Sequence, residues 1–358
     1  MGTSVKQSSM SQAGVWFLQS GIQESNGGVA RYYNVESRQN LPVSTEITGY
    51  TASALAYLHA RTGAAAYLDA ATRVAGFLRD KAWDAASNTF PFEPASNKAY
   101  FFDLGIIARG LMAVHRATGD PTLRSRAEEA ALSLAFDFLG EGCFYPAISV
   151  PEKEPLPEEP RWSRKPGCFQ LKAALIWKDL DNEQGRRMFD VALAMALASH
   201  ESFLADEPNR EKLMDRLHAY CYFLEALLAA PEHPEARAAL ASGIAKTGAL
   251  LREIAPVFER SDVNAQLLRV RLIAHHLDIV PLNLAAAEEE ASRAASFQVL
   301  DGPSAEDPRL AGGYWFGRKG DRMLPYSNPV STAFCMQALA LWDDHQSGLW
   351  NFSLPQLI

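Results

Sequence analysis

Two acidic residues near the starts of two predicted helices, 45–62 and 102–117, are the first candidates for chemistry in this chain of 358 residues. Glu46 and Asp103 each lie in the first turn of a predicted helix that follows a loop. Hydrolysis or transfer of a glycosidic bond uses two carboxyl groups, one protonated as the acid and one ionised. Acidic residues also stabilise helix N-termini without any catalytic role, and this interpretation stays open for both. Asp262 is the reserve carboxylate, although helix capping is preferred for it because Ser261-Asp262 opens its helix.

A second group of residues has the chemistry to bind a sugar, and its members lie in loops or near helix starts. The group comprises Arg31, Tyr32, Tyr50, Trp162, Arg164, His218, Asn264 and Trp315. Aromatic rings stack on the apolar faces of pyranoses, and charged forks bind hydroxyls or carboxylates. Bidentate pairing of guanidinium with carboxylate favours an acidic sugar. The arginines that carry this preference are Arg31, Arg164, Arg318 and Arg322.

Histidine and glycine patterns limit the other chemistries. His218 lies among apolar and aromatic residues. Three roles stay open for it: a general base, a hydrogen-bond partner of the substrate, and a hydrogen-bonded structural histidine. No two histidines fall together at helix starts, which argues against a zinc site and a two-histidine sugar epimerase. The glycine pairs at 27–28 and 312–313 lack the spacing of phosphate-binding loops. We therefore expect no metal and no cofactor.

The elements that position these residues are predicted to be almost entirely helical. Periodicity of about 3.6 residues and Gly/Pro punctuation predict twelve helices. They span 5–19, 45–62, 66–83, 102–117, 121–138, 168–180, 183–205, 211–230, 234–256, 262–278, 282–299 and 329–346. Strand signals are confined to short pieces such as 89–92 and 143–145, so no large sheet is expected.

The loops alternate in length, and this alternation predicts helical hairpins. Tight turns follow the helices that end near 62, 117, 180, 230 and 278, whereas mostly longer loops precede the helices that start near 45, 102, 168, 262 and 329. Gly49 and Gly63 recur at Gly105 and Gly119, an offset of 56 residues. The glycine pair 27–28 recurs at 312–313 and the segment Pro42-Val43-Ser44-Thr45 at 329–332, and both offsets are close to five periods of about 57 residues. Six hairpins then account for the chain if the first and last helices pair.

This arrangement resembles the six-hairpin glycosidase-like superfamily, whose members are (α/α)6 toroids with two concentric helix layers. The resemblance implies an all-α fold, one toroid domain over residues 1–358, and a site at the rim where the long loops gather. It also implies a carbohydrate-active enzyme, a hydrolase, lyase or epimerase, with a small-molecule or oligosaccharide substrate. A non-catalytic sugar-binding or scaffold toroid stays open. A terpenoid-cyclase-like toroid is less favoured, because the chain has no DxDD or DDxxD run.

Composition and charge restrict the partners. The chain is 48% hydrophobic and 21% charged, typical of a globular protein, and its net charge of −8 argues against extended nucleic-acid contact. The four cysteines are scattered, no apolar run reaches membrane-spanning length, and residues 1–7 lack a secretory signal. We therefore expect a cytoplasmic protein without membrane contact; the sequence indicates no oligomeric state.

The segment 151–160 is rich in Pro and Glu and leads directly to Trp162 and Arg164. Two interpretations stay open for it, a lid over the site and a disordered excursion.

Overall fold

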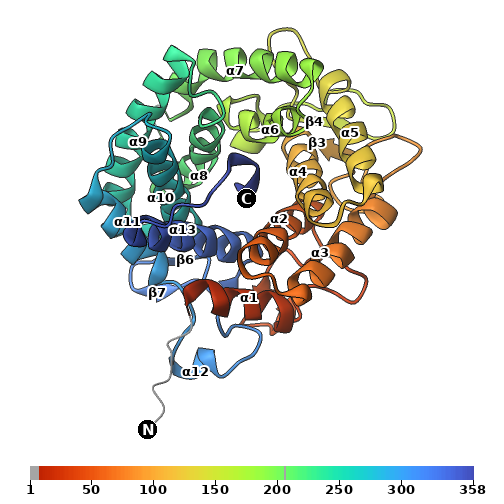
Figure 1. The fold of residues 1–358 in the computed structure, drawn as a ribbon. Coiled ribbons are helices and arrows are strands. Elements are labelled where there is room, and N and C mark those ends of the chain that lie inside the picture. Colours follow the sequence, from red (N-terminus) through yellow and green to blue (C-terminus); the bar gives the residue numbers. More distant parts are fainter. Residues whose placement is uncertain (1–7, 205–206) are drawn as a thin grey trace.

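The computed structural model describes residues 8–204 and 207–358, and these residues form a closed ring of helices (Figure 1). Residues 5–7 and 205, at the ends of two predicted helices, lie outside the described residues. The α-helices of the described chain are α1 (Ser9–Gln19), α2 (Thr45–Thr62), α3 (Ala65–Phe77), α4 (Phe101–Thr118), α5 (Pro121–Phe136), α6 (Leu171–Asp179), α7 (Glu183–Phe203), α8 (Arg210–Leu227), α9 (Pro234–Ile254), α10 (Ser261–His276), α11 (Leu284–Ala295), α12 (Gly302–Ala305) and α13 (Pro329–Ser347).

The ring has two concentric layers. The inner helices are α2, α4, α6, α8, α10 and α13, and the outer helices are α1, α3, α5, α7, α9 and α11 (Figure 1). Each inner helix packs on the outer helix that follows it, except that α13 packs on α1 and so closes the ring. The predicted (α/α)6 toroid of six hairpins is confirmed.

Two local features differ from the prediction. The helix predicted for 66–83 is α-helical only to Phe77, and the chain continues as a π-helical turn over Leu78–Ala82. The four-residue helix α12 lies in the loop after α11 and has no helical periodicity long enough to detect.

The tight turns have the backbone conformation that their glycines predict. Gly63 and Gly119 end α2 and α4 with φ of 69° and 75°, in the left-handed region. Their N–H groups donate to the carbonyls of His59 and His115. This is a common helix ending, and glycine adopts it without steric cost.

Another repeated glycine sets the spacing of the inner layer. A Cβ on Gly49 would lie 2.8 Å from the Cα of Ile107, and one on Gly105 would lie 2.4 Å from the carbonyl oxygen of Ala173. These positions are where α2 contacts α4 and where α4 contacts α6. The absence of a side chain therefore lets neighbouring inner helices pack backbone against backbone.

The distant repeat is also structural, with one shift in register. The N–H of Val29 donates to Thr48 Oγ1 at 3.0 Å, and the N–H of Tyr314 donates to Thr332 Oγ1 at 3.1 Å. Each bond fixes a Gly-Gly loop against the inner helix that follows it. Thr332 therefore matches Thr48, whereas the sequence repeat had matched it to Thr45.

Short strands lie in the long loops between hairpins. β1 (Tyr33–Asn34) pairs with β2 (Gln39–Asn40) and with β8 (Tyr326–Ser327), and all pairings are antiparallel. β3 (Lys98–Tyr100) pairs with β4 (Ala147–Ser149), and β6 (Gly317–Lys319) pairs with β5 (Phe258–Arg260) and β7 (Arg322–Met323). These small sheets hold the loops that lead into the inner helices.

Charged residues fill the middle of the ring. Glu225 on α8 is fully buried and forms ion pairs with Arg269 on α10 and with Lys172 on α6, at 3.0 Å from the lysine. Although burial opposes ionisation, the two cations hold the pKa of Glu225 below its ordinary value. Lys172 Nζ also donates to the carbonyl oxygen of Ile358 at 2.9 Å, so the last residues of the chain lie inside the ring (Figure 1).

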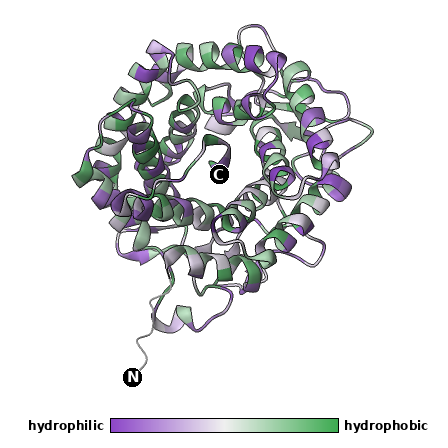
Figure 2. Cartoon of the chain, in the orientation of Figure 1, coloured by the Kyte–Doolittle hydropathy of each residue, from purple (hydrophilic) through white to green (hydrophobic). Residues whose placement is uncertain are grey.

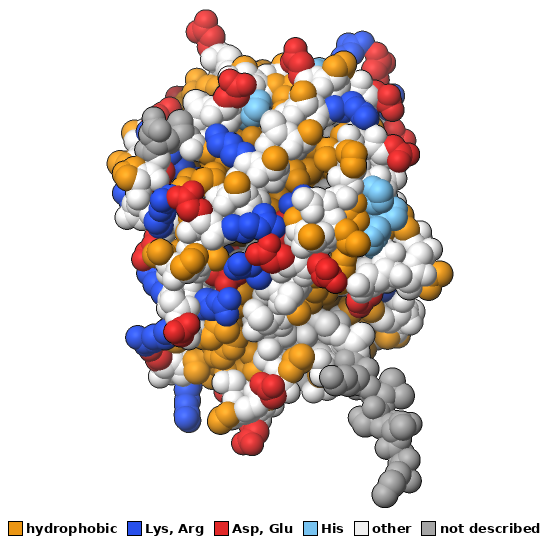
Figure 3. Space-filling view, turned by 90° about the vertical axis from the view of Figure 1, so that its left-hand side faces the viewer, with side chains coloured by type: hydrophobic (Ala, Val, Ile, Leu, Met, Phe, Trp, Pro, Cys, Tyr) orange, Lys and Arg blue, Asp and Glu red, His pale blue; other side chains and the backbone are white. Residues whose placement is uncertain are grey.

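The outside of the ring is mixed in character. Helices of both layers carry hydrophobic and hydrophilic residues along their length (Figure 2). Acidic and basic side chains are interspersed on the side that carries α9 (Figure 3), where Arg252 pairs with Glu289 at 2.7 Å. In the described part of the chain, no helix has the length and apolar character needed to cross a membrane. All four cysteines are free thiols.

Candidate active site

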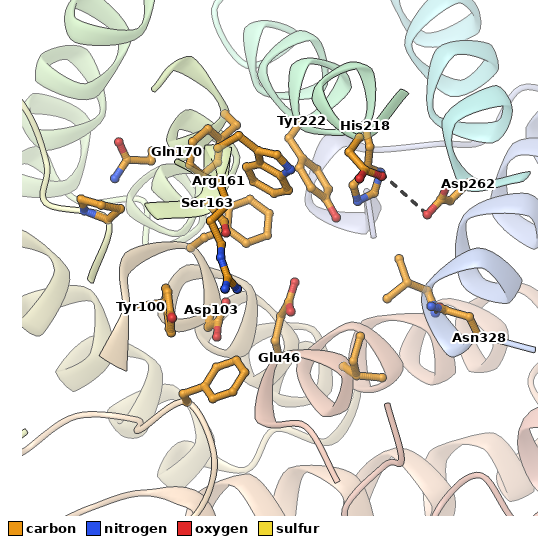
Figure 4. A pocket seen from close by; sticks show the side chains of 18 of the residues that line it. Glu46, Tyr100, Asp103, Arg161, Ser163, Gln170, His218, Tyr222, Asp262 and Asn328 are labelled. Carbon is orange, nitrogen blue, oxygen red and sulfur yellow. Dashed lines mark hydrogen bonds and ion pairs between the residues drawn. The ribbon is translucent and has the colours of Figure 1, made fainter. Parts of the chain in front are cut away.

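A cavity of about 430 Å³ opens where the inner helices begin, at the end of the ring to which the long loops lead. Its volume falls within the usual range for ligand pockets, about 300–1,000 Å³. Many of its polar side chains point into the same space (Figure 4). The lining residues are Glu46, Ile47, Phe92, Tyr100, Phe102, Asp103, Pro146, Arg161, Trp162, Ser163, Phe169, Gln170, Asp215, His218, Tyr222, Arg260, Asp262, Asn328 and Val330.

The two predicted catalytic carboxyls both reach this cavity. Glu46 is the second residue of α2 and Asp103 the third residue of α4, so neighbouring inner helices present them side by side (Figure 4). Neither acts as a helix cap: the Oγ of Ser44 caps α2, and the residue before α4 makes no side-chain cap bond. Asp103 is 7% exposed, and its Oδ2 is buried without a hydrogen-bond partner among the described residues.

Burial changes the ionisation of both carboxyls. Removal from water raises the pKa of Glu46 from 4.5 to about 7, and the nearby Arg31 opposes this effect. Burial raises the pKa of Asp103 well above its ordinary value, and the negative charge of Glu46 raises it further. Two interacting carboxyls titrate as a pair. Both shifts favour the protonated forms, so the pair tends to keep a proton at a higher pH than two ordinary carboxyls would.

Aromatic rings form much of the wall beside the carboxyl pair. Phe102 contacts Tyr222, with ring centroids 4.6 Å apart, and Trp162 contacts Phe169 edge-on at 5.0 Å. Tyr50 is 2% exposed and stacks behind Tyr222 at 6.5 Å, so it supports this wall from beneath. The aromatic surface supplies the apolar faces on which a pyranose ring can stack.

The opposite wall is built from α8 and the start of α10. Arg260 Nη1 donates to Asp215 at 2.7 Å, and its Nε and Nη2 donate to both oxygens of Asp262 at 3.0 and 2.6 Å. His218 Nδ1 lies 2.8 Å from Gln266 Oε1 and 3.8 Å from Asp262 (Figure 4). Because the amide oxygen only accepts, Nδ1 carries the hydrogen and Nε2 is left as an acceptor.

Burial, together with the charge of Arg260, lowers the pKa of His218 to about 4, so this imidazole is neutral at pH 7. Burial opposes ionisation of Asp262, yet Arg260 holds its pKa below the ordinary value. Asp262 lies in the first turn of α10, as the capping interpretation expects. Its carboxylate, however, is paired with Arg260 and faces the cavity.

The Pro/Glu-rich segment leads into one side of the cavity. After it, the chain forms a 3-10 turn over Trp162–Arg164, and residues 161–163 line the cavity. Arg164 is 5% exposed, and it fixes the turn by ion pairing with Glu159 at 2.7 Å and by donating to the carbonyl of Pro157 at 2.7 Å. The end of this segment is therefore tied to the wall of the site.

The structure brings together only part of the predicted binding set. Trp162 and His218 line the cavity, and Tyr50 lies behind it. Arg31 pairs with Glu93 at 2.7 Å beside the carboxyl pair.

The other predicted binding residues contact elements away from the cavity lining. Tyr32 packs on Tyr326, with ring centroids 5.0 Å apart. Asn264 donates to Glu259 at 3.2 Å. The backbone carbonyl of Trp315 accepts from Ser261.

Asp215 and Arg260 were not predicted. Asp215 lies one turn before His218 on α8, and a three-residue spacing on a helix places both on one face. That spacing is the sequence signal from which Asp215 could have been predicted as a site residue. Arg260 is the last residue of β5, and its side chain turns back toward Asp262. In the described part of the chain, no group of three or more His, Cys, Asp or Glu is placed to hold a metal ion.

Comparisons with known proteins show the same fold in sugar-active proteins. No family model matches the chain, and no curated protein matches it in sequence. Cellobiose 2-epimerase from Spirochaeta thermophila superposes with a TM-score of 0.68 at 15% identity, covering 92% of this chain and 93% of the epimerase. D-mannose isomerase superposes with a TM-score of 0.67 at 8% identity, covering 96% and 100%.

A glycoside hydrolase family 76 mannosidase from Bacteroides thetaiotaomicron is also similar, with a TM-score of 0.61 at 12% identity, covering 94% of this chain and 99% of the mannosidase. At such low identity, the likeness establishes a shared architecture. The resemblance to six-hairpin glycosidase-like toroids is therefore confirmed at the level of the fold.

Proposed function

We propose that the protein is a carbohydrate-active enzyme that hydrolyses a glycosidic bond, with Asp103 as the acid and Glu46 as the base or nucleophile. The observation that carries the proposal is the pair of buried carboxyls that share an aromatic-lined cavity and titrate at raised pKa. Two carboxyls whose environments keep one protonated and let the other ionise match the requirement of glycoside hydrolysis.

Each carboxyl has a defined part in this reaction. Asp103 donates its proton to the glycosidic oxygen as the bond to the anomeric carbon breaks. Glu46 either removes a proton from the attacking water or attacks the anomeric carbon itself. Its pKa of about 7 makes ionised Glu46 abundant at and above neutral pH. Asp103 Oδ2 is buried and has no hydrogen-bond partner among the described residues, so no donor there stabilises the ionised form, which favours Asp103 as the protonated acid.

The proteins of similar structure support a sugar substrate, and they leave epimerisation and isomerisation to be tested beside hydrolysis. They are named as an epimerase, an isomerase and a mannosidase, so this architecture serves several sugar reactions. Hydrolysis is favoured because His218 is the single histidine among the residues that line the cavity, whereas the carboxyls come as a pair. A non-catalytic sugar-binding toroid is the second candidate, since the aromatic wall alone is sufficient to bind a pyranose.

A panel of β- and α-linked disaccharides and aryl glycosides tests the proposal. Thermal shift reports binding, and product analysis distinguishes hydrolysis, elimination and epimerisation. Glu46→Gln and Asp103→Asn should each lower turnover by at least about 10²-fold with the fold intact, because each keeps the shape and removes an ionisable group. Glu36→Gln, at an exposed position, is the matched control. Binding without turnover would favour the sugar-binding alternative, and two fully active amide variants would reject the assignment.

A further inference from the structure

The cavity wall opposite the carboxyl pair is rich in hydrogen-bond acceptors. Asp215 uses one carboxylate oxygen to accept from Arg260, and its side chain remains 48% exposed at the cavity. His218 donates from Nδ1 to Gln266 and so offers Nε2 as an acceptor. Groups of this kind bind partners that donate hydrogen, such as hydroxyl and ammonium groups.

The charges around the cavity are predominantly negative. Three carboxylates line it at pH 8, those of Glu46, Asp215 and Asp262, because the proposed function keeps Asp103 protonated; they face the two guanidinium groups of Arg161 and Arg260. A further negative charge brought into this space is repelled by its neighbours, and the repulsion is stronger where water is partly excluded.

The buried guanidinium group of the wall, that of Arg260, is already occupied. All three nitrogens of Arg260 donate to carboxylates, and the guanidinium lies 4.5 Å over the ring of Phe316. Arg161 Nε lies 3.2 Å from Glu159, and the Arg161 side chain is 69% exposed at the rim. The buried Arg260 is therefore not left as an unpaired fork of the kind that recognises a carboxylate or a sulfate.

The arginines that had favoured an acidic sugar do not line the cavity. Arg318 pairs with Glu259 at 2.6 Å, and Arg322 pairs with Glu36 at 3.4 Å. The ion pairs of Arg31 with Glu93 and of Arg164 with Glu159 likewise use their charge on the protein itself. The number of arginines in the predicted binding set therefore overstates the positive charge available to a substrate in the cavity.

We propose that the cavity selects a sugar that presents hydrogen-bond donors and carries no negative charge, with Asp215 and His218 as the specificity-determining acceptors. This inference rests on the proposed function and specifies its substrate class. Neutral pyranosides and their amino analogues bind, whereas uronates and sulfated or phosphorylated sugars are rejected.

Matched methyl glycosides that differ at one position test this selectivity. The probes are the neutral, uronic-acid and 2-amino-2-deoxy forms of the gluco and manno series, with dissociation constants measured by NMR titration at low salt and pH 8. The neutral form should bind at least about tenfold more tightly than its uronate. Raising the salt concentration should lower this ratio of the two affinities, because salt screens the repulsion of the uronate.

Asp215→Asn provides the residue-level test, since it keeps the shape and an acceptor oxygen but removes the charge. It should lower the ratio of the affinity for the neutral glycoside to that for the uronate by at least about threefold, because it weakens the repulsion of the uronate. Asp181→Asn, 91% exposed on the surface, changes the net charge equally and should leave the ratio unchanged.

The outcomes separate the two proposals. A uronate that binds as tightly as its neutral partner would overturn the selectivity while leaving the sugar site in place. An Asp215→Asn ratio equal to that of the unmodified protein would overturn the role of Asp215. If no member of either series binds, the proposed function itself fails.

Discussion

Replacing Glu46 by Gln should stabilise the protein at alkaline pH even as it removes the carboxyl proposed to act in catalysis. In the folded protein the pKa of Glu46 lies at about 7, against an ordinary value of 4.5. The native state therefore binds more protons than the unfolded chain between these pH values, and its stability falls as pH rises through this window. Below about pH 4.5 both states are protonated and the penalty is absent.

The size of the effect follows from that difference in pKa. At about 1.4 kcal/mol for each pKa unit, ionised Glu46 costs the folded state at most about 3.5 kcal/mol above pH 7. Contact with the solvent in the cavity and its coupling to Asp103 reduce this figure. We expect Glu46→Gln to gain about 1–3 kcal/mol relative to the unmodified protein at pH 8, and much less at pH 5.

Urea unfolding of both proteins at pH 5 and pH 8 measures this difference. Glu36→Gln is the control, because Glu36 is 65% exposed and its replacement should change stability by less than about 0.5 kcal/mol at either pH. A stability difference between Glu46→Gln and the unmodified protein that is equal at pH 5 and pH 8 would refute the reasoning. It would mean that Glu46 ionises as an ordinary surface carboxyl.

Two further predictions concern the ring itself. Glu225→Gln leaves the buried cations Arg269 and Lys172 without their anion, so it should cost about 3–5 kcal/mol in urea unfolding; a loss below about 1 kcal/mol would show that the network is not buried as described. Thr48→Val and Thr332→Val each leave a loop N–H unpaired and should each cost about 1–3 kcal/mol, so a large effect at one site and none at the other would contradict their equivalence.

The ring could be predicted because its signals are local and repeated. Gly63 and Gly119 end helices in the same way, and Gly49 and Gly105 lie at equivalent contacts between neighbouring inner helices. The carboxyl pair followed from these repeats, because equivalent positions on neighbouring inner helices face the same space.

The opposite wall could not be predicted in this way because it depends on how side chains fold back. The clamp of Arg260 by Asp215 and Asp262 joins two helices and a strand, and no repeat in the sequence reports it. The equivalence of Thr332 and Thr48 likewise became visible only in the structure, where the N–H of Tyr314 donates to Thr332 Oγ1. The Pro-Val-Ser-Thr match in the sequence had paired Thr332 with Thr45. Arginine counts could not reveal which guanidinium groups were already paired.

The pH dependence of kcat/KM on the best glycoside of the panel tests the central claim most directly. If ionised Glu46 and protonated Asp103 act together, kcat/KM should rise with an apparent pKa near 7 and fall again at higher pH as Asp103 loses its proton. Glu46→Gln should abolish the rise and lower the plateau by at least about 10²-fold. A profile that stays flat between pH 5 and pH 9, with full activity in Glu46→Gln, would contradict the account.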